Sequence, residues 1–132
     1  MTLIDTNVLI DVAARDPQWA AWSERALDAA AILGPLAING VVFAELSIGF
    51  DRLEECEAFL SELGVGALPI PRPALFLAGK VFRRYRGRGG PRQGVLPDFF
   101  IGAHAAVAGL PLMTRDPRRY RTYFPTLRLI AP

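Results

Sequence analysis

Four carboxylates occupy sequence positions that suit a metal-dependent reaction on a phosphate ester. Asp5 and Asp116 each follow a short apolar run, whereas Glu45 and Asp98 interrupt segments that are apolar on nearly every side. A buried carboxylate is costly unless it is paired or bound to a cation. A group of carboxylates without cysteine or histidine suits a hard cation, Mg²⁺ or Mn²⁺. Such a cation can activate water and neutralise charge on a phosphodiester.

Each of these acids also has a purely structural interpretation. Asp5, Asp98 and Asp116 can cap helices, and Glu45 can pair with an arginine. The pair Asp116-Pro117 predicts a helix start, with aspartate as the N-cap and proline at the first helical position. We nevertheless expect a common site, because four independent structural acids would rarely all fall on buried helices or at one edge of a sheet.

The elements that must position these acids alternate between short strands and helices. Strands are expected at residues 2–4, 36–38, 67–70, 110–114 and 126–130. Helices are expected at residues 7–14, 17–33, 40–48, 51–63, 73–85 and 98–108, with a short one after Pro117. This alternation predicts an α/β fold with a central, mainly parallel sheet of about five strands in one domain, residues 1–132. Ligand sites of such sheets form outside the carboxyl ends of the strands, where Asp5 and Asp116 are expected.

Charge is distributed unevenly along the chain. Residues 1–65 hold three basic and eleven acidic residues, a net charge of −8. Residues 66–132 hold twelve basic residues and only two acids, Asp98 and Asp116, a net charge of +10. The basic half predicts a face for a polyanion, with mutual attraction of the two halves as the alternative.

The composition also excludes several classes of protein. A single cysteine, Cys56, rules out an intrachain disulfide, and we expect it to pack in the core. The first residues lack a basic segment, which argues against a signal peptide. The longest apolar stretch, residues 99–113, is broken by glycine and proline, so we expect no membrane span and a cytoplasmic location.

Four short segments carry a resemblance to a known family. They are "LIDTNVLID" (3–11), "FAEL" followed by Gly49 (43–49), "LPDFFIGAHA" (96–105) and "LMTRDPRRY" (112–120). In this order they resemble the acidic motifs of the PIN domain, and with the compact length they resemble VapC-type toxins of bacterial toxin–antitoxin pairs. The resemblance covers essentially the whole chain. One departure is Asn39, where many relatives carry serine or threonine, and asparagine can cap the helix equally well.

The resemblance implies a PIN-like three-layer α/β/α sandwich and a Mg²⁺- or Mn²⁺-dependent endoribonuclease. It makes the protein the toxin of a type II, VapBC-like pair, inhibited by a small antitoxin protein and assembled as a homodimer. It implies that metal and attacking water are held by Asp5, Glu45, Asp98 and Asp116. It also implies that these acids are supported by Thr6, Asn7 and Thr114. Attack by water would leave a 5′-phosphate and a 3′-hydroxyl.

The basic half supplies candidates for binding the RNA backbone, with a strong dependence on salt. They are Lys80, Arg83, Arg84, Arg86, Arg88, Arg92, Arg115, Arg118 and Arg119. The glycine-rich segment 86–96 can be an RNA-contacting flap or a plain loop. The one histidine, His104, is expected to be a core or groove residue and not a ligand.

Two other functions compete with the nuclease. A non-catalytic RNA-binding module would use the basic half but leaves Asp5 and Glu45 unexplained. A phosphoryl-transfer domain, either a receiver or a haloacid-dehalogenase-like domain, also places an aspartate after its first strand. The dehalogenase-like form needs a second aspartate where Asn7 stands. Both forms need an active-site lysine late in the chain, whereas the only lysine, Lys80, lies before the motifs that it should follow. We therefore disfavour the phosphoryl-transfer interpretation.

Overall fold

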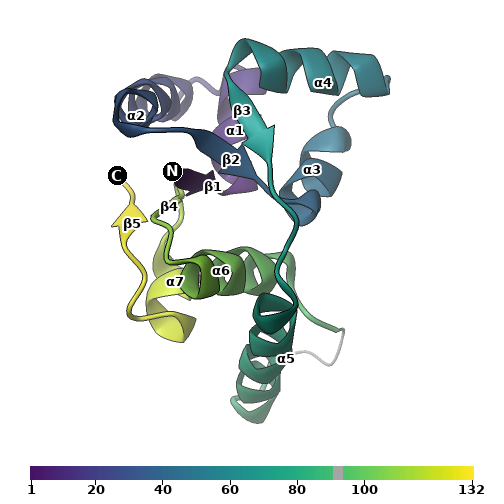
Figure 1. Cartoon of the computed structure of the whole chain (residues 1–132), viewed down its shortest axis with the longest axis vertical. Coiled ribbons are helices and arrows are strands. Elements are labelled where there is room, and N and C mark those ends of the chain that lie inside the picture. The colour runs from purple at the N-terminus through teal and green to yellow at the C-terminus, as the bar shows by residue number, and fades with distance from the viewer. Residues whose placement is uncertain (91–93) are drawn as a thin grey trace.

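Five short parallel strands form the centre of the structure, a computed structural model that describes residues 1–90 and 94–132 (Figure 1). In spatial order they run β3-β2-β1-β4-β5, and each neighbouring pair is parallel. Their bounds are Thr2–Ile4 (β1), Leu36–Ile38 (β2), Val65–Ala67 (β3), Leu112–Met113 (β4) and Leu129–Ile130 (β5). The central strand β1 is buried throughout, as expected for a parallel sheet covered on both faces.

Helices cover both faces of this sheet. One face carries α1 (Thr6–Ala13), α2 (Ala20–Leu33) and α4 (Leu53–Glu62), drawn above the strands in Figure 1. The other carries α5 (Arg72–Gly87), α6 (Pro97–Ala108) and α7 (Arg118–Tyr123), drawn below them. The helix α3 (Gly40–Ser47) contacts both α1 and α6. The expected three-layer α/β/α sandwich is therefore confirmed.

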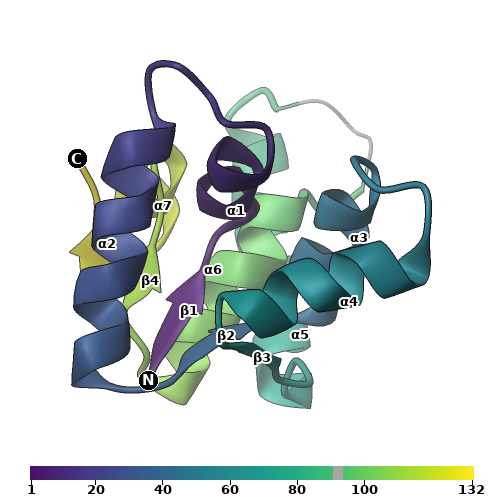
Figure 2. The ribbon, with the colours of Figure 1, turned by 90° about the horizontal axis from the view of Figure 1, so that it is seen from above.

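The helices that follow β1 and β2 begin where the sequence predicted caps. Asp5 has an extended backbone, and its Oδ1 accepts from the N–H of Thr6 at 2.7 Å. Asn39 Oδ1 accepts from the N–H groups of Val41 and Val42 at 3.0 and 3.1 Å. Each cap satisfies backbone donors that the first helical turn leaves unpaired. Both caps lie at carboxyl ends of strands, and Figure 2 shows α1 leaving the tip of β1.

The helix α6 is the buried centre of the second helical layer. Its residues 101–105 are all buried, which agrees with a sequence that is apolar on every side. Gly102 lies so close to the Phe124 ring that a Cβ atom there would stand 2.4 Å from it. Cys56 of α4 is 1% exposed and packs in the core as expected. In residues 1–90 and 94–132, no helix combines the length and apolar character needed to cross a bilayer.

Several element boundaries differ from the sequence-based expectations. The third strand covers residues 65–67 and not 67–70, because its pairing with β2 ends at Ile38↔Ala67 and Pro69 has no N–H to continue the ladder. It is the edge strand that Pro69 indicated. The second helix begins at Ala20 and not at residue 17, because Asp16 Oδ1 holds the preceding turn through the N–H groups of Gln18 and Trp19.

The helix expected at 51–63 covers Leu53–Glu62, with Arg52 at its N-cap. Further differences lie in the second half of the chain. The fourth and fifth strands are two residues long, shorter than the expected 110–114 and 126–130. The helix expected at 73–85 extends from Arg72 to Gly87, so the start of the glycine-rich segment 86–96 is helical. Residues 91–93 of that segment lie outside the described residues.

Candidate metal-binding and catalytic site

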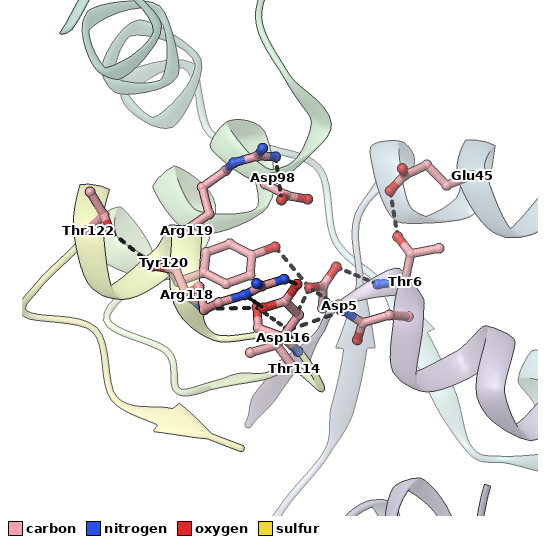
Figure 3. Close-up of polar contacts among 11 residues, drawn as sticks. Asp5, Thr6, Glu45, Asp98, Thr114, Asp116, Arg118, Arg119, Tyr120 and Thr122 are labelled. Atoms are coloured by element: carbon pink, nitrogen blue, oxygen red, sulfur yellow. Dashed lines mark hydrogen bonds and ion pairs between the residues drawn. The ribbon is translucent and has the colours of Figure 1, made fainter. Parts of the chain in front are cut away.

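The four acids expected to act together come from four different elements that meet beyond the carboxyl end of β1. Asp5 directly follows β1 and caps α1, Glu45 lies on α3, Asp98 lies in the first turn of α6, and Asp116 lies between β4 and α7. In Figure 3, Asp98 and Asp116 lie on one side of Asp5 and Glu45 on the other. Burial is the main cause of the raised pKa of both Asp5 and Asp98, and a neighbouring carboxylate adds to each rise: Asp98 at Asp5, and Asp116 at Asp98.

Asp5 is the most buried of these acids, with 4% of its surface exposed. Burial raises the pKa of Asp5 to about 6, and nearby Asp98 adds to the rise. Hydrogen bonds from Thr114, Tyr120 and the Thr6 N–H oppose that rise. In the described part of the chain, no basic side chain forms an ion pair with Asp5. A buried carboxylate without a cationic partner is electrostatically suited to bind a metal ion.

Thr6, Asn7 and Thr114, the polar residues expected to support the acids, surround Asp5. Thr114 Oγ1 donates to Asp5 Oδ2 at 2.8 Å, and Asn7 Nδ2 donates to the same oxygen at 3.2 Å. Thr6 Oγ1 instead donates to Glu45 Oε1 at 2.6 Å (Figure 3). Thr6 thus links the first and second acids, through its backbone to Asp5 and through its side chain to Glu45.

The other two aspartates are paired with arginines of α7. Arg118 holds Asp116 with two hydrogen bonds, Nε to Oδ1 and Nη2 to Oδ2, each 2.9 Å long. Arg119 Nη1 donates to Asp98 Oδ2 at 3.0 Å. The pKa of Asp116 is lowered to about 2, chiefly by the hydrogen bond from Arg118. Burial raises the pKa of Asp98, and the attraction of Arg119 opposes that rise.

The expectation that Asp116 caps the last helix is wrong. The residue at the N-cap of α7 is Pro117, and no side chain caps the helix. Asp116 Oδ1 lies 3.4 Å from the N–H of Arg118, at the long limit of a hydrogen bond. The Asp116 carboxylate is instead engaged mainly by the Arg118 guanidinium, which binds both of its oxygens at 2.9 Å.

The donor chemistry at the site fits a hard divalent cation. The groups are carboxylates and hydroxyls, the oxygen ligands that Mg²⁺ and Mn²⁺ prefer, without thiol or imidazole. Among residues 1–90 and 94–132, no three acidic, histidine or cysteine side chains are close enough together to count as a preformed metal site. Two of the four acids, Asp116 and Asp98, are instead paired with Arg118 and Arg119 of α7.

Two features of the site were not predicted from the sequence. The Tyr120 hydroxyl donates to Asp5 Oδ2 at 3.0 Å, and burial together with Asp5 raises the tyrosine pKa well above its usual value. Asp11, only 2% exposed, binds Arg115 Nε at 2.7 Å and Ser23 Oγ at 3.2 Å. A signal for Asp11 did exist, because it is the only charged residue of α1, as Glu45 is of α3.

The described residues proposed to bind RNA fall into two groups. The first group, on α5 and just after it, is exposed: Lys80, Arg83, Arg84, Arg86 and Arg88. The second group forms ion pairs around the site: Arg115 with Asp11, Arg118 with Asp116 and Arg119 with Asp98. Arg83 and Arg86 line an open groove of about 510 Å³ with Phe82. Arg92 lies outside the described residues.

His104 is a buried structural residue, as expected. It is 2% exposed, its Nδ1 lies 3.2 Å from Asn39 Nδ2, and burial lowers its pKa. Asn39 therefore caps α3 with its oxygen and contacts His104 with its nitrogen. A serine or threonine at this position has no amide nitrogen, so the departure noted in the sequence gives α3 and α6 an additional polar contact.

Comparison with known proteins agrees with this architecture. A family model described as the PIN domain matches residues 2–125. The chain therefore belongs to the PIN domain family. A comparison with curated proteins found no match.

Solved structures with a similar fold include several toxin–antitoxin complexes. VapBC2 from Rickettsia felis, bound to a DNA fragment from its promoter, has a TM-score of 0.76 at 19% identity, over 99% of this chain and 98% of that chain. VapBC-1 from nontypeable Haemophilus influenzae has a TM-score of 0.71 at 18% identity, over 98% of this chain and 96% of that chain. A toxin–antitoxin complex from Klebsiella pneumoniae has a TM-score of 0.69 at 21% identity, over 98% of this chain and 96% of that chain. At these identities, the likeness establishes the fold.

Proposed function

We propose that this PIN domain protein is a divalent-metal-dependent endoribonuclease and the toxin of a VapBC-like toxin–antitoxin pair. The observation that carries the proposal is Asp5, a buried carboxylate with which no basic residue among 1–90 and 94–132 forms an ion pair. Asp5 lies next to Asp98 and is linked through Thr6 to Glu45. Membership of the PIN domain family supports a nuclease. The similar folds of the VapBC complexes support the toxin assignment.

The residues of the site are proposed to have three different roles in phosphodiester hydrolysis: binding the metal, positioning Asp5 and binding the phosphate. A Mg²⁺ or Mn²⁺ ion held by Asp5, Glu45, Asp98 and Asp116 would supply an activated water and neutralise developing charge. Asp5 is held in place by the Thr6 N–H, Asn7 and Thr114. Arg118 and Arg119 stand beside the acids, where their guanidinium groups can hold the phosphate and stabilise the transition state.

The exposed cations of α5 are proposed to hold the RNA backbone away from the cleavage point. Figure 1 shows that α5 projects from the body of the protein beside α6, which carries Asp98. Arg86 lies over the Phe82 ring and Lys80 over the Phe76 ring, so the charges are supported by apolar contacts. Binding through phosphate contacts should weaken steeply as salt is added.

A small antitoxin is the proposed protein partner. An apolar groove of about 410 Å³ lies between α1 and the end of α3, with Glu45 in its wall. Its exposed rim includes Ile10 (43%) and Ile48 (86%). Exposed apolar surface of this kind marks a site of protein interaction, and here it adjoins the acids. The homodimer implied by the resemblance stays a prediction that the molecular mass in solution would check.

The test of the proposed function is cleavage of a labelled RNA by the purified protein after metal removal. Mn²⁺ or Mg²⁺ should restore cleavage by the wild type, leaving fragments with 5′-phosphates. Asp98→Asn should reduce the rate at least about 100-fold, because it removes a carboxylate from the metal site. Asp28→Asn, the same change at an exposed position of α2, should cleave like the wild type.

Two results would contradict the proposal. If metal gives the wild type no more cleavage than Asp98→Asn, the protein is not this enzyme, and retained RNA binding in EDTA would favour the non-catalytic RNA-binding module. If an equivalent DNA strand is cleaved as fast as the RNA, the substrate assignment is wrong. Circular dichroism of both variants separates loss of chemistry from loss of fold.

A further inference from the structure

Tyr120 connects the last helix of the chain to the acid at the end of the first strand. Its side chain is 1% exposed, although it belongs to a short helix whose other residues are at least partly accessible. The hydroxyl donates to Asp5 Oδ2 at 3.0 Å across a sequence separation of 115 residues. Figure 3 shows the ring extending from α7 toward Asp5, beneath Arg119 and Asp98.

The two oxygens of Asp5 have different surroundings. Three donors converge on Oδ2: Thr114 Oγ1 at 2.8 Å, the Tyr120 hydroxyl at 3.0 Å and Asn7 Nδ2 at 3.2 Å. Within the described residues, Oδ1 accepts only the Thr6 N–H, at 2.7 Å. A carboxylate oxygen has about two lone-pair directions, so Oδ2 is saturated and Oδ1 keeps one direction open.

We propose that Tyr120 is a positioning residue that fixes Asp5 so that Oδ1 is the oxygen offered to the metal. The proposal rests on the proposed function, because it concerns the same metal site. A phenol suits this role, since it is rigid and its buried ring cannot rotate away from the carboxylate. Hydrogen bonds from neighbouring side chains commonly orient metal-binding carboxylates in this way.

The same contact holds α7 in place. This helix has six residues and no side-chain cap, so its own hydrogen bonds are too few to stabilise it without contacts to the rest of the protein. Tyr120 anchors it next to Asp5, and the two preceding residues, Arg118 and Arg119, then stand beside Asp116 and Asp98. One hydroxyl thus sets both the free oxygen of Asp5 and the position of the two arginines.

Tyr120→Phe tests this inference, because it removes the hydroxyl and keeps the ring. The matched control is Tyr85→Phe, whose ring on α5 packs against Phe99 outside the site. Mn²⁺ affinity is measured on each folded protein without RNA, by calorimetry or by electron paramagnetic resonance. We expect the Kd for Mn²⁺ to rise about tenfold or more in Tyr120→Phe and to change less than twofold in Tyr85→Phe. At saturating Mn²⁺, kcat should fall while KM for RNA changes little.

The outcomes separate this inference from the proposed function. If the wild type binds Mn²⁺ and cleaves RNA but Tyr120→Phe binds Mn²⁺ equally well, the positioning role is wrong and the nuclease stands. A lower Tm for Tyr120→Phe with unchanged Mn²⁺ affinity likewise shows a structural role only. If the wild type neither binds Mn²⁺ nor cleaves RNA, the proposed function fails and the inference fails with it.

Discussion

Replacing Asp5 with asparagine should abolish RNA cleavage and, at neutral pH, make the metal-free protein more stable than the wild type. Burial raises the pKa of Asp5 from 3.8 to about 6, and this rise corresponds to about 3 kcal/mol lost when the carboxyl ionises in the folded state. An amide has an acceptor at one end only, so either the Thr6 N–H or the donors that now converge on Oδ2 lose their acceptor, a loss of about 1 kcal/mol. The net gain in free energy of unfolding should be about 1–2 kcal/mol.

The difference in stability between Asp5→Asn and the wild type should change with pH in one direction. Because the folded protein holds the Asp5 proton more tightly than the unfolded chain does, the stability from this group is fully present below about pH 3.8 and is lost as pH rises through about 6. The free energy of unfolding of the wild type, measured in urea with EDTA, should therefore fall relative to that of Asp5→Asn across this window. A difference that does not change with pH, or a variant that is less stable at pH 7.5, would contradict the account.

Arg115→Ala should destabilise the protein by about 3 kcal/mol, the second large effect we expect. Arg115 is the ion-pair partner of Asp11, which is 2% exposed, and removing it would leave a buried charge whose remaining described partner is the Ser23 hydroxyl. Its guanidinium also lies over the Trp19 ring, a contact that would be lost too. Urea unfolding at neutral pH measures the loss, and Asp11→Asn in the same chain should recover part of it.

The matched control for Arg115→Ala is Arg121→Ala, an exposed arginine of α7 that should change stability by less than about 0.5 kcal/mol. This comparison also tests the expectation that Arg115 binds RNA. If Arg115→Ala weakens RNA binding while leaving stability unchanged, Arg115 acts as an RNA contact, and its ion pair with Asp11 contributes little to the free energy of unfolding. Loss of stability at unchanged affinity for RNA would assign it to the structure alone.

The sequence was sufficient for features that depend on neighbouring residues. Asp5 and Asn39 were expected to cap helices because their side chains reach backbone groups within three residues, and both caps are present. The alternation of apolar runs with helical periods predicted the order of strands and helices. The exposed cations of α5 follow the same logic, since Lys80 and the arginines after it fall on the basic tail of one helix.

Features that depend on contacts between distant residues could not be predicted in this way. Tyr120 and Asp5 are 115 residues apart, and Arg115 and Asp11 are 104 apart, so no local pattern pairs them. The error at Asp116 has a different origin, because Arg118 is only two residues away and the rule for helix caps takes no account of a neighbouring guanidinium. The contacts of Tyr120 and Arg115 therefore appeared only with the fold, whereas the four acids proposed for the site could be nominated from the sequence.

A crystal structure of the protein grown with Mn²⁺, with the anomalous signal of manganese recorded, tests the central claim most directly. We predict a manganese peak bonded to Asp5 Oδ1, with Asp98 and Asp116 turned from Arg119 and Arg118 toward the ion. A protein that stays metal-free at millimolar Mn²⁺, with both arginine pairs intact, would contradict the account, as would manganese bound only elsewhere on the surface.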